Sequence, residues 1–126
     1  MEMTITFPGG QAVDADFNGL VVHTDQDGTA PSPFSLFLAS LATCAGFYVL
    51  SFCQKRKLPV EQLKLVQKST RDPETHRLTE VRLEIEAGPG IPEKYHEAMI
   101  RAAAQCAVKR ALENPPQIVV LVNGKG

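Results

Sequence analysis

An uncharged stretch of 21 residues, FSLFLASLATCAGFYVLSFCQ at positions 34–54, decides the fold of this chain. Its apolar side chains fall on every face of a helix instead of forming one stripe. Ser32 suits the N-cap of this helix and Pro33 its first turn, whereas the cations at 55–57 and then Pro59 predict its end. Because a helix that is apolar all round must be surrounded, we expect a long buried central helix.

Either a bilayer or protein must surround this helix. Roughly 20 apolar residues would span a membrane, but polar side chains dilute the run, so we expect no membrane association. A chain of 126 residues has difficulty enclosing such a helix alone. Two copies could enclose it, and we therefore expect a homodimer. The diluting residues are Ser35, Ser40, Thr43, Cys44, Ser51 and Cys53.

The residues before the helix predict a strand meander. Residues 3–7 and 12–17 alternate between polar and apolar side chains around the turn Pro8-Gly9-Gly10. After the turn dipeptide Asn18-Gly19, residues 20–24 are rich enough in β-branched side chains for a third strand.

The residues after the helix predict a hairpin, a second helix and a final strand. Residues 60–69 and 79–87 read as two strands around a turn at 72–74. Pro92 opens a helix that carries Cys106 on its apolar face, and residues 118–122 read as a short, fully buried strand. The whole pattern predicts one α+β domain over residues 1–126.

Composition excludes several classes of function. With 44% apolar residues, 21% charged residues and a net charge of -1, the chain has no basic excess for nucleic acid. The acid at Glu2 and the early glycines do not suit an export signal. Three cysteines, an odd number, favour a reducing cytoplasm over a disulfide framework. Three isolated histidines, His23, His76 and His96, predict no metal site, and we expect no cofactor.

The cysteines are the candidates for chemistry. Cys44 and Cys53 lie nine residues apart on one helix, which places them on opposite faces and about 13 Å apart along the axis. They cannot bridge, because a disulfide needs Cα atoms within about 7 Å. Cys106 faces inward from another helix, and nothing local forbids its meeting Cys44. Packing as small hydrophobes is the alternative for all three thiols, and we favour it for Cys53.

A thiolate is the nucleophilic form, and a cysteine in the middle of a helix needs a nearby cation to lower its pKa. Residues 1–54 contain no Lys or Arg. Lys109 and Arg110 follow Cys106 closely and could supply charge, although cations near helix C-termini are common for stability alone.

Two segments resemble the OsmC/Ohr family of cysteine-based peroxidases. PSPFSLFLASLATC at positions 31–44 is similar to the family's central helix, which ends in the peroxidatic cysteine. AAAQCAVKRAL at positions 102–112 is similar to the segment around its resolving cysteine, and Thr24-Asp25 with Gly28 resembles the loop before the central helix. The expected elements also follow in the family's order.

The resemblance implies an intertwined dimer in which sheets from both subunits enclose the two central helices. It implies that the Cys44 thiolate attacks a peroxide and becomes a sulfenic acid, which Cys106 resolves to a disulfide that a dithiol later reduces. An apolar pocket beside the central helices would favour organic hydroperoxides. We expect it to be lined by Phe34, Phe37, Leu41 and Phe47.

The sequence departs from the family at two activating positions. Peroxidase members carry a Glu nine or ten residues before the peroxidatic cysteine, where this chain has Ser35 and Phe34. They also bring an Arg from the N-terminal strands, where this chain has no cation; Arg77, Arg82 or a partner's cation could substitute.

Three hypotheses remain open from the sequence. The first is an organic hydroperoxide reductase that uses Cys44 and Cys106. The second is a non-peroxidatic dimer that binds an apolar or thiol-containing small molecule. The third is a structural or partner-binding dimer whose cysteines only pack.

Overall fold

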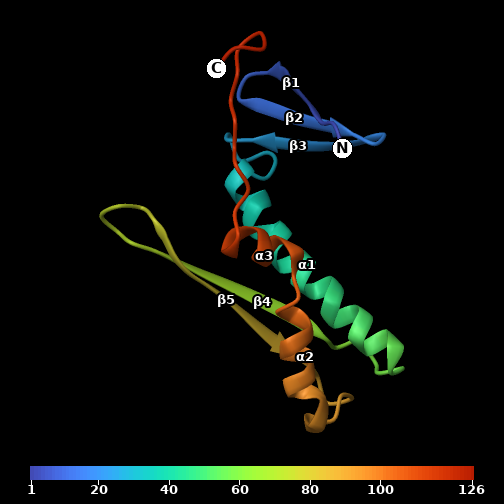
Figure 1. Ribbon diagram of the computed structural model, residues 1–126. Helices are drawn as coiled ribbons and strands as arrows, with labels where there is room; N and C mark the ends of the chain where they lie inside the picture. The colour runs from blue at the N-terminus through green and yellow to red at the C-terminus, as the bar shows by residue number, and fades with distance from the viewer. The chain divides into compact units, whose positions relative to one another are not determined.

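The computed structural model describes all of residues 1–126 and contains two compact units, Met1–Ser40 and Leu41–Gly126. The secondary structure is a mixed set of helices and antiparallel strands, as expected for an α+β protein (Figure 1). One helix, α1 (Pro33–Lys55), begins in the first unit and ends in the second.

The first unit is a three-stranded antiparallel meander. Its strands β1 (Thr4–Gly9), β2 (Ala12–Phe17) and β3 (Leu20–Asp25) are neighbours in chain order. The turn between β2 and β3 places Asn18 and Gly19 at positive φ, at 51° and 75°. Asn and Gly tolerate this left-handed conformation best, which is why this dipeptide makes a tight hairpin turn. The predicted meander is confirmed.

Helix α1 begins where the sequence predicts. The Ser32 hydroxyl accepts a hydrogen bond from the Ser35 backbone N–H at 3.2 Å, and Pro33 is the first helical residue. At the other end, Lys57 takes a φ of 55° and the Leu58 N–H donates to the Cys53 carbonyl at 2.9 Å. A residue in the left-handed conformation is a common way to close a helix.

The burial of α1 differs from the expected all-round enclosure. Only one face is buried within the chain, at Leu41, Ala45, Val49, Phe52 and Cys53. Elsewhere on the helix Thr43 is exposed and Phe47 is 63% exposed. Burial on every side was inferred from composition, and a single copy of the chain supplies packing partners for one stripe only. By length and composition alone α1 is also long enough to cross a membrane, a test that core helices of globular proteins pass as well.

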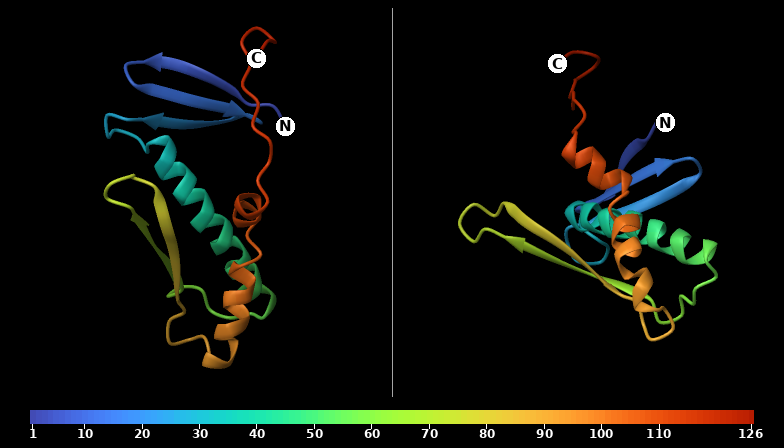
Figure 2. Two further views of the ribbon diagram at one scale, coloured as in Figure 1. Left: turned by 60° about the vertical axis from the view of Figure 1, so that its left-hand side comes forward. Right: turned by 60° about the horizontal axis from the view of Figure 1, so that its bottom comes forward.

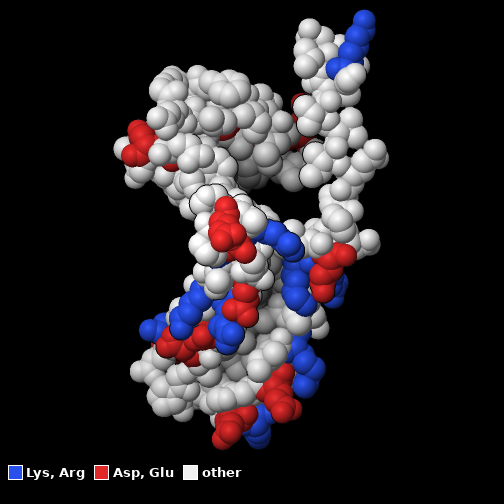
Figure 3. All heavy atoms as spheres, turned by 90° about the vertical axis from the view of Figure 1, so that its left-hand side faces the viewer, with Lys and Arg blue, Asp and Glu red and all other residues white.

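The second unit contains the predicted hairpin of β4 (Lys64–Arg71) and β5 (Leu78–Glu86). In β5 the apolar residues alternate with exposed charged ones, so one face packs on helices and the other meets water. Cross-strand ion pairs Lys64–Glu86 at 3.9 Å and Lys68–Glu84 at 3.4 Å lie on the wet face. Figure 3 views the molecule from the side of this hairpin and shows cations and anions interspersed there.

The expected second helix is interrupted. A short 3-10 turn, η1 (Glu93–Tyr95), leads into α2 (His96–Ala103), and the chain then breaks before α3 (Ala107–Glu113). Cys106 lies at the break, with φ -51° and ψ 122°. Its extended backbone lets it serve as the N-cap of α3, so one predicted helix becomes two.

The predicted final strand is not formed in the single chain. Residues 118–122 are all exposed, with Val120 82% exposed, and the only bridge there joins Val122 to Lys125. In both views of Figure 2 the chain after α3 runs away from α2 and the hairpin. Five consecutive apolar residues indicate that a segment needs cover, but they do not identify the strand that would cover it.

Two apolar clusters form the core of the second unit. The larger one gathers residues of α1, of the loop after β5 and of α2, and Tyr95 packs edge-on against Phe52. Its buried members are Val49, Phe52, Cys53, Ile91 and Met99. The smaller cluster consists of Leu41, Ala45 and Cys106, with Cys44 packed against it. This smaller cluster contains both thiols singled out by the sequence.

Candidate functional site

Cys44 lies midway along α1 and is half-buried. It precedes Ala45, which is fully buried, so its side chain lies at the border of the buried stripe. Apolar residues from β4, β5 and the α2–α3 region surround the small cluster there. They are Leu65, Val81, Leu83, Ala103 and Val108.

Cys106 is held by two contacts at the break between α2 and α3. Its sulfur accepts a hydrogen bond from the Lys109 backbone N–H at 3.4 Å, which caps α3. Its S–H donates to the carbonyl of Leu41 at 3.6 Å, one turn before Cys44 on α1. With 1% of its surface exposed, Cys106 points inward as the helical spacing predicts.

The structure brings Cys44 and Cys106 together. The two residues pack in one cluster, and the Cys106 thiol lies close enough to lower the pKa of Cys44. Both cysteines are free. Sequence spacing left their meeting open, and tertiary packing brings them into contact.

The two thiols differ in acidity. The backbone N–H of Val108 lowers the pKa of Cys44 from its ordinary value; burial opposes this, and the Cys106 thiol and the Ala107 N–H reinforce it. Burial raises the pKa of Cys106, against the hydrogen bond from Lys109. The more acidic thiol is the one with access to solvent, and the less acidic thiol is the buried one. This is the order that a nucleophile and a resolving thiol require.

Within the single chain, no Lys or Arg side chain is among the influences that lower the pKa of Cys44. Lys109 and Arg82 pair with Glu113 at 3.8 Å and Glu80 at 3.4 Å. Lys109 contributes through its backbone N–H to Cys106 and not through its charge to Cys44. Sequence reasoning missed Val108, because every non-proline residue carries an N–H and its direction depends on the fold.

Cys53 belongs to the other cluster. It is fully buried among Val49, Phe52, Ile91 and Met99, and burial raises its pKa while nearby Arg56 opposes the rise. A buried thiol with a raised pKa is a poor nucleophile. This placement fits the packing role favoured for Cys53.

The four residues expected to line a substrate pocket lie in different surroundings. Leu41 is buried beside the thiols. Phe47 is exposed and packs edge-on against Tyr48, with ring centroids 5.6 Å apart. Phe34 and Phe37 lie in the first unit, 5.4 Å apart between ring centroids. Their joint role in binding stays a prediction.

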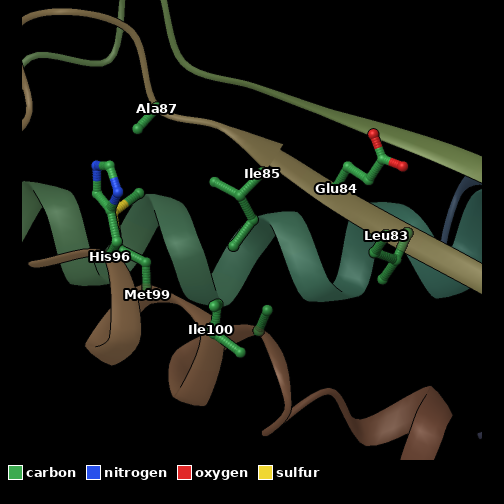
Figure 4. Close-up of a pocket in the computed structure, with 8 residues that line it drawn as sticks. Leu83, Glu84, Ile85, Ala87, His96, Met99 and Ile100 are labelled. Atoms are coloured by element: carbon green, nitrogen blue, oxygen red, sulfur yellow. The ribbon is translucent and has the colours of Figure 1, made fainter. Parts of the chain in front are cut away.

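An apolar pocket of about 360 Å³ lies between β5 and α2 (Figure 4). In that view Met99 and Ile100 rise from α2 towards Ile85 on β5, and His96 lies at the end near Ala87. Leu83 and Ala103 line this pocket and also pack against the thiol cluster. The other lining residue is Glu84, whose carboxylate pairs with Lys68.

The chain contains no group of three or more His, Cys, Asp or Glu side chains placed to hold a metal ion. His23 instead pairs with Asp14 at 3.0 Å on the meander. The site consists of two thiols, the backbone donors of α3 and apolar walls.

Comparisons with known proteins identify the family and the fold. The family model described as OsmC-like protein matches residues 25–120. Among solved structures, a hypothetical protein from Aquifex aeolicus VF5 matches with a TM-score of 0.74 and 19% identity, covering 92% of this chain and 89% of that one. No curated protein matches the chain.

Two further structures have the same fold. An OsmC-like protein from Mycoplasma pneumoniae matches with a TM-score of 0.71 and 15% identity, over 90% of this chain and 87% of that one. The organic hydroperoxide resistance protein OhrB of Bacillus subtilis matches with a TM-score of 0.58 and 17% identity, over 91% and 93%. At these identities the likeness establishes the fold alone.

Proposed function

Because this chain belongs to the OsmC-like protein family, we propose that it reduces organic hydroperoxides through Cys44, with Cys106 as the resolving thiol. One observation carries the proposal. Two free thiols from distant parts of the chain are in contact, and the pKa of Cys44 is lowered while that of Cys106 is raised. Cysteines that only fill space in a core do not require contact between two thiols whose pKa values are shifted in opposite directions.

The chemistry follows from these two thiols. The Cys44 thiolate attacks the distal oxygen of the hydroperoxide and the O–O bond breaks, leaving a sulfenic acid on Cys44 and an alcohol after protonation of the leaving alkoxide. The Cys106 sulfur then attacks the Cys44 sulfur, forming a disulfide and releasing water. A dithiol reductant restores both thiols by exchange.

Backbone donors take over part of the task that the missing cation performs in the family's peroxidases. The Val108 N–H is the largest influence that lowers the pKa of Cys44, and the Ala107 N–H adds to it. Hydrogen bonds to a thiolate favour its charged form in the same direction as a nearby positive charge. Activation of this kind is available at Cys44 without any Lys or Arg side chain.

The proposal includes a homodimer in the cytoplasm and an apolar substrate. Exposed Phe47 on α1 and the uncovered residues 118–122 are apolar surface that a second copy would cover. Apolar walls around the thiols favour an organic hydroperoxide over hydrogen peroxide. Several structural relatives, among them OhrB of Bacillus subtilis, are organic hydroperoxide resistance proteins, which is consistent with this substrate class.

Thiol titration before and after equimolar cumene hydroperoxide tests the proposal. In denatured wild-type protein we expect the titre to fall from three thiols per chain to one, with Cys53 retained. In Cys106→Ser we expect a sulfenic acid trapped at Cys44, and in Cys44→Ser no reaction. Cys53→Ala is the matched control and should react like wild type. Unchanged thiols in wild type would rule out the peroxidase.

The pocket between β5 and α2 favours a second candidate, binding of an apolar small molecule without peroxide chemistry. Its volume of about 360 Å³ lies within the range of ligand sites. Thermal stabilisation by an aliphatic ligand that persists in Cys44→Ser, together with unreactive thiols, would support this candidate. Loss of stabilisation in Ala103→Phe, which would fill the pocket, would place the ligand there.

A further inference from the structure

The first turn of α3 is held by sulfur. This helix has seven residues and none of them is buried. The Cys106 sulfur accepts the N–H of Lys109, and the Cys44 sulfur receives the N–H of Val108. The opening N–H groups of a helix have no partner inside the helix, so these two sulfurs are their acceptors.

Little else holds α3 in place. A helix this short is marginal in water without tertiary contacts. Val108 is the one half-buried residue of α3, and it packs against the thiol cluster. All residues from Lys109 to the end of the chain are exposed. The order of α3 therefore depends on its cap.

Disulfide formation changes both acceptors. Attack of the Cys106 sulfur on the neutral Cys44 sulfenic acid forms the S–S bond, and the Cys106 proton leaves with the sulfenic hydroxyl as water. Cys106 then has no S–H to donate to the Leu41 carbonyl, now 3.6 Å away. A disulfide sulfur carries no charge, so it is a weaker acceptor for the Val108 N–H than the thiolate form that this donor favours at Cys44.

We propose that the Cys44–Cys106 disulfide uncaps α3, so that oxidation of the thiol pair melts the first turns of this helix and reduction restores them. Cys106 is then both the resolving thiol and the switch that reports the redox state of the site. The switch rests on the proposed function in one respect only: peroxide reduction is the reaction that would form the Cys44–Cys106 disulfide in the cell.

Residue-resolved amide hydrogen exchange on the full chain tests this switch. The disulfide is made with diamide, an azo compound that accepts the two hydrogens of a thiol pair and becomes a hydrazine, so no peroxide is needed. We expect exchange at Lys109, Arg110 and Ala111 to be about fivefold to tenfold faster in the oxidised protein, the range expected for loss of one helix cap. Amides of α2 should be unchanged.

Two variants separate the cap from the disulfide. Cys106→Ser keeps a side-chain acceptor and cannot form the bond, so α3 should exchange slowly before and after diamide. Cys106→Ala has neither cap nor bond, and α3 should exchange fast in both conditions. If Cys106→Ala does not fold, the comparison of wild type with Cys106→Ser still shows whether the disulfide speeds amide exchange in α3.

Equal exchange in reduced and oxidised wild type, with the disulfide verified by mass, would overturn the switch, and so would failure of diamide to form the bond. The peroxidase proposal fails separately. Thiols that are inert to cumene hydroperoxide, combined with faster exchange after diamide, would leave the switch standing and remove the peroxidase.

Discussion

The backbone N–H of Val108, in the first turn of α3, is directed at the sulfur of Cys44 in the middle of α1 and is the main cause of the lowered pKa of that thiol. The contact joins two helices that are far apart in the sequence. It places a donor on the candidate nucleophile where the sequence offers no cation.

Removal of this donor should reduce the reactivity of Cys44. Val108→Pro lacks the N–H, so the pKa of Cys44 should rise and its alkylation by iodoacetamide at pH 7 should slow by about fivefold, as expected for one charge-assisted hydrogen bond. Val108→Ala keeps the N–H and should react like wild type. An unaltered rate in a folded Val108→Pro protein would assign the activation to another group.

Cys53 should make the stability of the protein fall at alkaline pH. Burial raises its folded pKa above the ordinary value of 9.0, so the protonated thiol stabilises the fold fully below that value. This contribution is lost as pH rises through the folded pKa. Urea denaturation of wild type and Cys53→Ala at pH 7, 9 and 10 should show a smaller alkaline loss in the variant. Parallel curves would contradict this assignment.

The larger core cluster should depend strongly on Met99. This residue is 1% exposed, so Met99→Ala should lower the free energy of unfolding by about 2 to 5 kcal/mol through lost burial and a cavity. Its neighbour Ile100 is 62% exposed, and Ile100→Ala should cost less than about 1 kcal/mol. Chemical denaturation measures both values. Similar losses for the two variants would mean that Ile100 is covered in solution.

If a second copy of the chain covers residues 118–122, a charged side chain introduced into this segment should weaken the dimer. Val120 is 82% exposed in the single chain, so Val120→Glu should leave the fold of a monomer unchanged but weaken a dimer that buries it. Light scattering coupled to size exclusion should show a shift towards monomer. Gln117→Glu, an exposed control just before the segment, should not shift the mass. Identical masses for all three proteins would place the dimer interface elsewhere.

Local signals predicted most of the elements correctly. The Asn18-Gly19 turn, the Ser32 cap and the alternation in β5 each depend on a few neighbouring residues, and each is found in the structure. The break before α3 was missed because residues 92–113 have continuous helical spacing. The contacts of Cys106 with Leu41 and Lys109 offset the lost helical turn, and one of them is a long-range contact.

The sequence by itself determined the α+β class, the length of α1, the inward direction of Cys106 and the absence of a cation near Cys44 along residues 1–54. These features follow from periodicity, caps and residue identity, which act over a few residues. Only the tertiary structure decided that Cys44 meets Cys106 and that Val108 supplies the donor. Every residue except proline carries a backbone N–H, so nothing in the sequence marks the one that packing directs at a thiolate.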